Sequence, residues 1–313
     1  MTVTKELFSL YFCPFPLFDN YSTKMFNRAK FNAGGITQPE NDYLLIILIL
    51  SSRKNVDRRN SIRSTWLKDK DNSKIKHLFA IGRSDNQEEN ELSSALLKEK
   101  NKYNDLLFLN VSEDYHNLSE KLLKSLDQLF KLYSFKFLLK CDDDTFTVIE
   151  ALLKELESED EKKLYWGFFD GKANVKTKGK WMEHNWFLCD KYLPYARGGG
   201  YILSYDLVRF ISTNKMYLQL YNNEDVSVGV WLSALNIKRK HDPRFDTEYK
   251  SRGCNNKYLI THKVSPEVMR DLHLNLKTTN RLCKYEFQKY RSYIYNWNYP
   301  PSQCCIRNNS LIP

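Results

Sequence analysis

The chain has 313 residues, 42% of them hydrophobic, and a formal net charge of +10. This length and apolar content exclude a disordered polypeptide and allow one large α/β domain or two small ones. The positive charge favours an anionic partner such as a nucleotide, a phosphate or an acidic polysaccharide, although lysines scattered over a surface would give the same total.

Residues 1–41 show no hydrophobic periodicity, and we expect them to form an irregular leader or stem. Their apolar stretch, residues 7–18, is shorter than the ~20 residues that a bilayer requires and contains two prolines. No clear transmembrane helix is therefore expected. Asn-x-Ser triplets favour a secretory lumen and begin at Asn20, Asn110, Asn117 and Asn308.

From residue 42 onward, apolar runs typical of buried strands alternate with helical patterns. Predicted strands occupy residues 44–50, 75–81, 106–111 and 137–141, with helices near 57–66, 92–97 and 118–133. This alternation predicts a doubly wound, mostly parallel sheet with helices on both faces. We also expect a helix over 145–157, strands at 164–169 and 201–204, and a helix that opens at Glu224.

Three consecutive carboxylates, Asp142, Asp143 and Asp144, follow the predicted strand at 137–141. Ligands of open α/β sheets bind beyond the carboxyl ends of the strands, and three like charges there require a counter-charge, most simply a divalent cation. The alternative is a solvated acidic turn, which the apolar sequence on both sides disfavours. An EF-hand is excluded because Phe146 and Thr147 occupy the fifth and sixth loop positions.

A basic helix is predicted directly after the first strand, and Arg59, Arg63 and Trp66 share one of its faces. Two guanidinium groups beside an aromatic ring suit a diphosphate that is joined to a base or a sugar. The alternative is a solvated basic helix.

The carboxylates of Glu224 and Asp225 stand at the start of a very apolar helix. The helix dipole alone could account for both, but a group-transfer enzyme also needs a base, and Asp225 is a candidate. The glycines at 198–200 lack dinucleotide-loop spacing and predict either a turn or a place where a ligand approaches the backbone.

The cysteines do not point to a zinc site, because no Cys-x-x-Cys pair is present. Apart from Cys13 in the leader, six cysteines permit three disulfides whose connectivity the spacing does not fix, or reduced core thiols.

Four motifs in order resemble the β-1,3-glycosyltransferase family over about residue 43 to the C-terminus. They are Arg58-Arg59-x-x-Ile62-Arg63-x-Thr65-Trp66, Lys140-x-Asp142-Asp143-Asp144, Tyr195-x-x-Gly198-x-Gly200-Tyr201-x-Leu203-Ser204 and Glu224-Asp225-Val226-x-x-Gly229. Residues 241–254 and 300–305 resemble those members of the family that act on the linkage region of proteoglycans.

The resemblance implies a GT-A fold at residues 42–313, with a nucleotide-sugar-binding half at 42–144 and an acceptor-binding half at 145–313. It implies an inverting enzyme of the Golgi lumen, membrane-associated, that uses Mn²⁺ and has no nucleic-acid partner. Its reaction would move galactose from UDP-galactose to the 3-hydroxyl of galactose in Gal-β-1,4-Xyl-O-Ser of proteoglycan core proteins. The alternatives are a β-1,3-N-acetylglucosaminyltransferase, a metal-dependent phosphodiesterase or a sugar-binding module without catalysis.

The resemblance also implies a role for each site residue. Asp225 is expected to be the catalytic base. The expected metal ligands are Asp142, Asp144 and His262; the sugar donor is expected to contact Arg59, Arg63, Trp66, Lys140 and Asp143, and the acceptor Trp166, Gly199, Gly200 and Glu224.

Overall fold

The computed structural model of the chain describes residues 40–84, 90–307 and 312–313. The chain divides into two units, residues 1–38 and 39–313, and the described residues all belong to the second, which is compact. The predicted leader lies outside the described residues, as do Asn20 and Asn308. Within the described ranges, none of the helices combines the length and the apolar character that crossing a membrane requires. The predicted domain boundaries stay a prediction.

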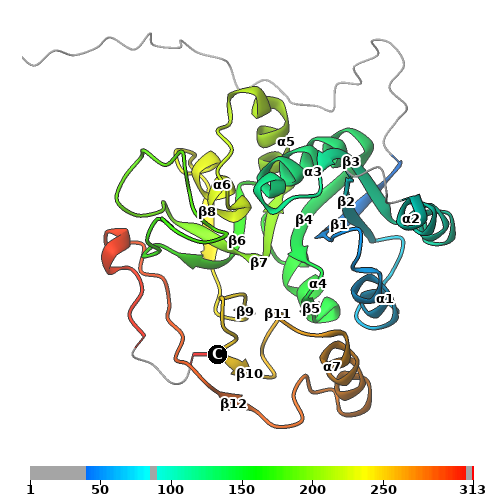
Figure 1. Cartoon of the computed structure of the whole chain (residues 1–313). Helices are drawn as coiled ribbons and strands as arrows, with labels where there is room; N and C mark the ends of the chain where they lie inside the picture. The colour runs from blue at the N-terminus through cyan, green and yellow to red at the C-terminus, as the bar shows by residue number, and fades with distance from the viewer. Residues whose placement is uncertain (1–39, 85–89, 308–311) are drawn as a thin grey trace, which may run out of the picture. The chain divides into compact units, whose positions relative to one another are not determined.

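A seven-stranded sheet forms the centre of the second unit (Figure 1). The strands β1 to β4 run parallel to one another, β7 is antiparallel to both β4 and β6, and β8 is parallel to β6. The predicted mostly parallel sheet is confirmed. From one edge to the other, the strands are β3 (Leu106–Ser112), β2 (Ile75–Arg83), β1 (Glu40–Leu50), β4 (Tyr133–Asp142), β7 (Tyr195–Ser204), β6 (Leu164–Asp170) and β8 (Lys238–His241).

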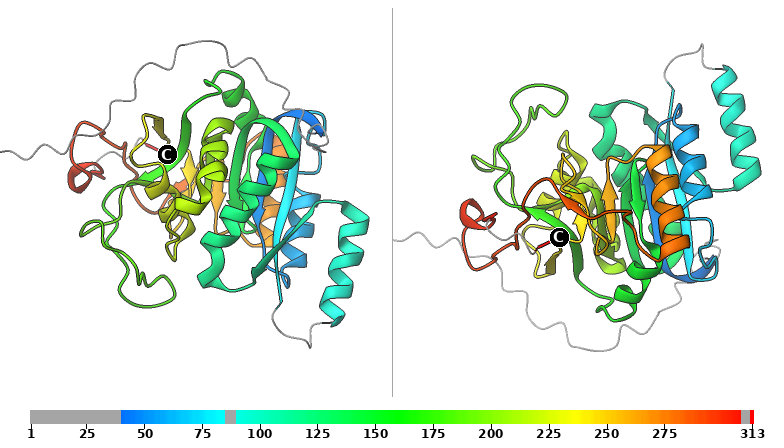
Figure 2. Two further views of the ribbon diagram at one scale, coloured as in Figure 1. Left: turned by 90° about the horizontal axis from the view of Figure 1, so that it is seen from above. Right: turned by 90° about the horizontal axis from the view of Figure 1, so that it is seen from below.

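Helices cover both faces of this sheet, which explains why its central strands are apolar on both sides. The side chains of β1 from Leu45 to Ile49 are fully buried. Figures 1 and 2 show α3 and α5 on one face and α1 and α7 on the other. The helices are α1 (Val56–Ser64), α2 (Asn90–Tyr103), α3 (Leu118–Leu132), α4 (Ile149–Glu157), α5 (Tyr205–Asn214), α6 (Glu224–Trp231) and α7 (Pro266–Thr279), with short 3₁₀ turns η1 (Tyr115–Asn117), η2 (Lys215–Tyr217) and η3 (Pro301–Gln303).

A small second sheet corrects the prediction of a helix from residue 145. Residues Thr145–Thr147 form β5, which pairs with β11 (Ile260–His262), while β11 in turn pairs with β9 (Phe245–Asp246). The helix α4 begins only at Ile149. Long-range pairing decides the conformation here, because Phe146 is buried and both its threonine neighbours are β-branched.

The cysteines of the described part form two disulfides. Cys254 of β10 (Gly253–Cys254) is bonded to Cys283, and Cys304 is bonded to its neighbour Cys305. The β10 strand also pairs with β12 (Phe287–Gln288), so the chain after α7 is fastened to the domain covalently and by backbone hydrogen bonds. Two thiols are free, at buried Cys141 and exposed Cys189.

Candidate active site

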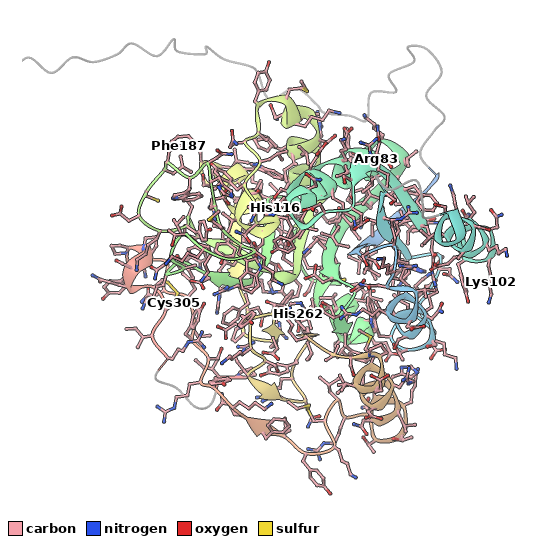
Figure 3. All side chains as sticks on the ribbon, in the orientation of Figure 1. Arg83, Lys102, His116, Phe187, His262 and Cys305 are labelled. Atoms are coloured by element: carbon pink, nitrogen blue, oxygen red, sulfur yellow. A yellow bond between two sulfur atoms is a disulfide. The ribbon has the colours of Figure 1, made fainter. Side chains whose placement is uncertain are left out.

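The predicted metal ligands come together where β4 ends. Asp142 is the last residue of β4, and Asp143 and Asp144 follow in the turn before β5. The antiparallel pairing of β5 with β11 sets Thr145 opposite His262. The imidazole therefore reaches the aspartates from the second half of the chain, and Figure 3 labels it where β11 approaches the central sheet.

Asp142, Asp144 and His262 are the one group of potential metal ligands found within the described ranges. Nε2 of His262 lies 2.9 Å from Oδ1 of Asp144 and 3.4 Å from Oδ2 of Asp142. One ligand atom from each side chain lies within 4.8 Å of the others. Two carboxylate oxygens and one imidazole nitrogen form a donor set that fits a divalent cation.

The charges around His262 favour a cation at this position. Burial lowers the pKa of His262, but the two carboxylates outweigh burial and raise this pKa to about 9. Burial also opposes ionisation of Asp142, yet Lys140 and His262 hold its pKa below the ordinary value. Neither ring nitrogen of His262 makes a well-oriented hydrogen bond to another described residue. A buried imidazole nitrogen that points at two ionised carboxylates is presented as a metal ligand would be.

Asp143 is buried and supports the cluster from the α1 side. Its carboxylate accepts hydrogen bonds from Ser51 Oγ (2.7 Å), Asn55 Nδ2 (2.8 Å) and Arg58 Nη1 (2.9 Å). Arg58 also lies 3.6 Å from Oδ2 of Asp144, and its side chain is 40% exposed. The expected contact of Asp143 with the sugar donor is thus replaced by a supporting role, and Arg58 is the arginine beside the aspartates.

The arginines predicted to face a diphosphate, Arg59 and Arg63, are instead held in internal ion pairs. Nη2 of Arg59 lies 2.7 Å from a Glu99 oxygen, and Arg63 bonds both Glu99 (2.7 Å) and Asp105 (2.8 Å). Trp66 is buried and lines a separate cavity against α4 and α7. The prediction is wrong for all three because helical spacing identifies a shared face but not what this face packs against.

Lys140 was expected to contact the sugar donor, but its side chain is fully buried. Its ammonium donates hydrogen bonds to Oδ1 of Asp142 (2.9 Å), the carbonyl of Gly198 (2.6 Å) and Oε1 of Glu224 (2.6 Å). Lys140 therefore contacts the predicted metal ligand and the predicted base region, and it has no surface left for a substrate. Glu224 is buried at this contact but also lines the cleft, and its contact with the acceptor stays a prediction.

Asp225 lies in the first turn of α6 and is partly exposed. Its Oδ2 accepts a hydrogen bond from the backbone N–H of Gly198 (2.9 Å), and its Oδ1 accepts one from the N–H of Val226 (2.9 Å). Burial, followed by the negative charge of Glu224, raises the pKa of Asp225. A fixed carboxylate with a raised pKa has the proton affinity that a general base requires.

Two of the predicted metal ligands and Asp225 meet at one cleft, a cavity of about 470 Å³. Asp142 and His262 line it together with Asp225. Its walls also include Trp181 and Tyr249, whose rings pack edge to face with their centroids 5.4 Å apart. Sequence reasoning did not assign these two aromatic residues to the site. The available signal was that Trp181 stands in a polar, lysine-rich segment and not in an apolar strand.

The predicted acceptor contact Trp166 lies in the core. It is a fully buried residue of β6, where its indole N–H donates to Asp242 Oδ2 (3.1 Å) and its ring packs on Phe245. The strand is buried along its whole length, so none of its side chains faces the cleft. An aromatic residue inside a continuous apolar run is a core residue, and this part of the prediction is wrong.

The glycines at 198–200 lie in strand β7 and do not form a turn. A Cβ on Gly199 would stand 2.5 Å from the His262 ring, and one on Gly200 would stand 3.1 Å from Ile260. The close approach that these two glycines allow is that of β11, which carries His262. Both positions therefore shape the metal site, and Gly199 also lines the cleft, so the acceptor contact of these glycines stays a prediction.

A mixed α/β sheet that ends in a carboxylate–imidazole group, with a second carboxylate on the same cleft, is typical of a metal-dependent group-transfer enzyme. The family model described as "Galactosyltransferase" matches residues 57–243. The chain belongs to this galactosyltransferase family, and its predicted resemblance to β-1,3-glycosyltransferases is confirmed.

The chain is also similar to individual proteins. The chain is 44% identical to mouse beta-1,3-galactosyltransferase 6 over 287 residues, which cover 90% of this chain and 88% of the relative. It is 34% identical to UDP-GalNAc:beta-1,3-N-acetylgalactosaminyltransferase 2 of Xenopus laevis over 67% of this chain, but spans only 41% of that relative. Among solved structures, the mannosyltransferase PcManGT from Pyrobaculum calidifontis in complex with GDP-Man and Mn²⁺ matches with a TM-score of 0.40 and 8% identity, over 75% of this chain and 64% of that chain.

Proposed function

We propose that this galactosyltransferase moves galactose from UDP-galactose to the 3-hydroxyl of galactose in Gal-β-1,4-Xyl-O-Ser, with inversion at the transferred sugar carbon. This is a galactosylxylosylprotein 3-β-galactosyltransferase activity. One observation carries the proposal: Asp142 and His262, which form a potential metal-binding group with Asp144, line the same cleft as the carboxylate of Asp225. The acceptor is proposed from the motif resemblance and from the 44% identity to mouse beta-1,3-galactosyltransferase 6.

The sugar-donor side of the cleft would hold Mn²⁺ on Asp142, Asp144 and His262, whose oxygen and imidazole ligands suit this ion. When bound, the ion would supply positive charge to the diphosphate that leaves with UDP. The half-exposed guanidinium of Arg58 lies beside the same aspartates and would add a second positive charge.

Asp225 would remove the proton from the attacking hydroxyl. As the acceptor oxygen forms its bond to the anomeric carbon, the bond from that carbon to UDP breaks and the proton passes to the Asp225 carboxylate. The backbone N–H groups of Gly198 and Val226 hold both carboxylate oxygens in place throughout. A single base is sufficient because inversion requires only one displacement.

Trp181 and Tyr249 would form the platform for the acceptor sugars. Both line the cleft, and Tyr249 is 61% exposed. Aromatic rings bind the apolar faces of sugars, and they can leave the hydroxyl groups free for polar contacts. Polar partners are available at the same wall from Lys180, which lies over the Trp181 ring.

We propose that the enzyme works in the Golgi lumen, in association with the membrane. The disulfide between Cys254 and Cys283 supports an oxidising compartment. The exposed position of Asn110, which begins an Asn-x-Ser triplet, is compatible with a glycan there. Transfer of core proteins through the secretory pathway would bring the acceptor to this site.

A metal-dependent phosphodiesterase is the less favoured function. Two-metal hydrolysis requires a second ligand group about 4 Å from the first. The ranges that the structure describes contain the single group of Asp142, Asp144 and His262, and the partly buried Asp225 near it is suited to proton removal.

A sugar-donor and acceptor screen tests the proposed function. The enzyme would be incubated with Mn²⁺, a galactosyl-β-1,4-xyloside and either UDP-galactose or UDP-N-acetylglucosamine, with product linkage determined by NMR. We expect a β-1,3-linked digalactosyl xyloside from UDP-galactose alone. Preference for UDP-N-acetylglucosamine, or for another acceptor, would contradict the proposed substrates while keeping the family.

A further inference from the structure

We propose that Lys140 is a positioning residue that fixes the metal ligand Asp142 and the base Asp225 relative to each other. The inference rests on the proposed function, which gives these two carboxylates their roles. Lys140 is fully buried, so it acts through its neighbours and not on a substrate.

The ammonium of Lys140 joins three separate elements at one atom. Nζ donates to Oδ1 of Asp142 at the end of β4, to the carbonyl of Gly198 in β7 and to Oε1 of Glu224 in α6. The distances are 2.9, 2.6 and 2.6 Å, so all three protons of the ammonium have acceptors at hydrogen-bond distance. A buried and fully hydrogen-bonded ammonium is rigid, and it limits how far its three partners can move apart.

Two connections carry this constraint to Asp225. The peptide group of Gly198 accepts from Lys140 through its own carbonyl, and the N–H of the same residue donates to Oδ2 of Asp225 (2.9 Å). Glu224, the second anionic partner of Lys140, is the residue directly before Asp225 in the first turn of α6. A displacement of the ammonium would therefore move Asp142 and Asp225 together.

Lys140 also affects the pKa of the proposed base, Asp225. Burial and the charge of Glu224 raise the pKa of Asp225, whereas the positive charges of Lys140 and Arg197 lower it. The phenols of Tyr115, Tyr165, Tyr192, Tyr195 and Tyr201 also lie near Asp225 and stay neutral at physiological pH. The other titratable groups that line the same cleft are Asp142, Lys176, Lys180, Tyr249, His262 and Lys263. Arg197 is itself paired with Asp170, so Lys140 is the cation joined directly to the peptide and the glutamate that flank the base.

A purely structural ion pair is the competing explanation, since buried lysines often serve only to satisfy buried carboxylates. The two explanations differ in the pH dependence of transfer. A structural lysine affects thermal stability, and its loss lowers the amount of active enzyme at every pH. A positioning lysine also determines the pH at which the base becomes active.

The test compares Lys140→Met and Glu224→Gln with the parent enzyme under saturating substrates and Mn²⁺. Removal of the Lys140 charge should lower kcat on the order of 100-fold and move the acidic midpoint of the pH–kcat profile up by about one unit. Removal of the Glu224 charge should move the midpoint in the opposite direction, because the neutral amide keeps its place beside Lys140 without repelling Asp225. Lys121→Met is the matched control, since Lys121 is also buried but bonds Ser51 and Glu113 and should leave the midpoint unchanged.

Opposite shifts of the midpoint support the proposal, and an unchanged midpoint in either variant overturns it. If Lys140→Met gives no cooperative thermal transition, Glu224→Gln decides through Mn²⁺ affinity. In Glu224→Gln, Lys140 should bond more strongly to Asp142, so Mn²⁺ binding should weaken several-fold although Glu224 is not a metal ligand. Unchanged Mn²⁺ affinity would overturn the proposed connection between Lys140 and the metal ligand. Failure of the parent enzyme to use a galactosyl-xyloside would contradict the proposed function instead, so the two failures are distinguishable.

Discussion

At the scale of single residues, Asp225 owes its proposed role to its surroundings. A solvated aspartate is ionised at neutral pH and is a weak base, whereas burial and the adjacent Glu224 raise the pKa of Asp225. Two backbone N–H groups hold its oxygens while the side chain still faces the cleft. Position and proton affinity together suit this carboxylate to deprotonate a hydroxyl.

The raised pKa of Asp225, to about 7, predicts the pH dependence of transfer. The base is active only when ionised, so kcat at saturating Mn²⁺ should fall as the pH is lowered through 7 and level off above it. A pH series of initial rates with UDP-galactose measures this directly. A flat profile between pH 5.5 and 7.5 would show that ionisation of Asp225 does not limit the reaction.

Removal of a metal ligand should primarily weaken the binding of Mn²⁺. Asp144→Ala is expected to weaken Mn²⁺ binding by at least about 100-fold, because one of the three proposed protein ligands is lost. Titration of the protein with Mn²⁺, followed by the EPR signal of the free ion, gives the affinity. Asp143→Asn is the matched control, since Asp143 lies outside the ligand group and should lose less than tenfold. Equal losses in both variants would contradict the assigned ligands.

Residue type and place along the chain could be predicted from the sequence, but exposure could not. Asp142, Asp144 and Asp225 were selected because carboxylates follow an apolar strand or open an apolar helix; Asp142 and Asp225 line one cleft, and Asp144 belongs to the same potential metal-binding group as Asp142. Lys140 and Trp166 were predicted from the family resemblance and prove to be fully buried. Whether a lysine side chain faces solvent or three buried acceptors depends on β7 and α6, which pack against it from far along the chain.

At the scale of elements, α1 shows how a correct helix can be given the wrong orientation. The sequence predicts its existence and its shared face, but Glu99 of α2 and Asp105 next to β3 turn the face with Arg59 and Arg63 inward. Arg58, on a different face of the helix, lies against the aspartates instead. Long-range ion pairs choose between the faces, and no local pattern reveals them.

The orientation of α1 separates the effects of two arginine substitutions. Arg58→Ala should raise the KM for UDP-galactose roughly tenfold with little change in thermal stability, because a half-exposed charge near the diphosphate is lost. Arg63→Ala should lower the free energy of unfolding by about 3 kcal/mol and leave this KM unchanged, because two buried carboxylates each lose one of their partners. Steady-state kinetics and thermal unfolding of both variants check this, and the reverse pattern would contradict the corrected orientation.

The packing of strand β7 likewise predicts different effects for substitutions of its two glycines, Gly199 and Gly200. A methyl group on Gly199 would collide with the ring of His262 at 2.5 Å, so Gly199→Ala should displace the imidazole and weaken Mn²⁺ binding. Gly200→Ala meets the flexible side chain of Ile260 at 3.1 Å and should cost only stability, about 1–3 kcal/mol. Mn²⁺ titration and thermal unfolding of the two variants distinguish these outcomes. Unchanged Mn²⁺ affinity in Gly199→Ala would show that β7 does not support the metal site.

At the scale of the whole domain, the cleft is built by both halves of the chain. The first half contributes Asp142 and Asp144 at the end of a parallel strand, and the second half contributes His262 and Asp225. The fold class was predictable because the alternation of apolar strands and helices is local. The short sheet of β5, β11 and β9 was not, since its strands have only two or three residues and β5 pairs with β11 across more than one hundred positions. This sheet is what brings His262 to the aspartates.

The proposed separation of UDP and metal binding from proton removal is tested most directly by Asp225→Asn. The amide keeps the size of the side chain. If its nitrogen takes the place of Oδ2, only the hydrogen bond from the N–H of Gly198 is lost. UDP binding in the presence of Mn²⁺, measured by calorimetry, should therefore match the parent enzyme. Transfer of galactose to the galactosyl-xyloside should fall by 10²–10⁴-fold, in the range that a general base contributes. Parent-like turnover in this variant would contradict the assigned base, and loss of UDP binding would contradict the separation of binding from proton removal.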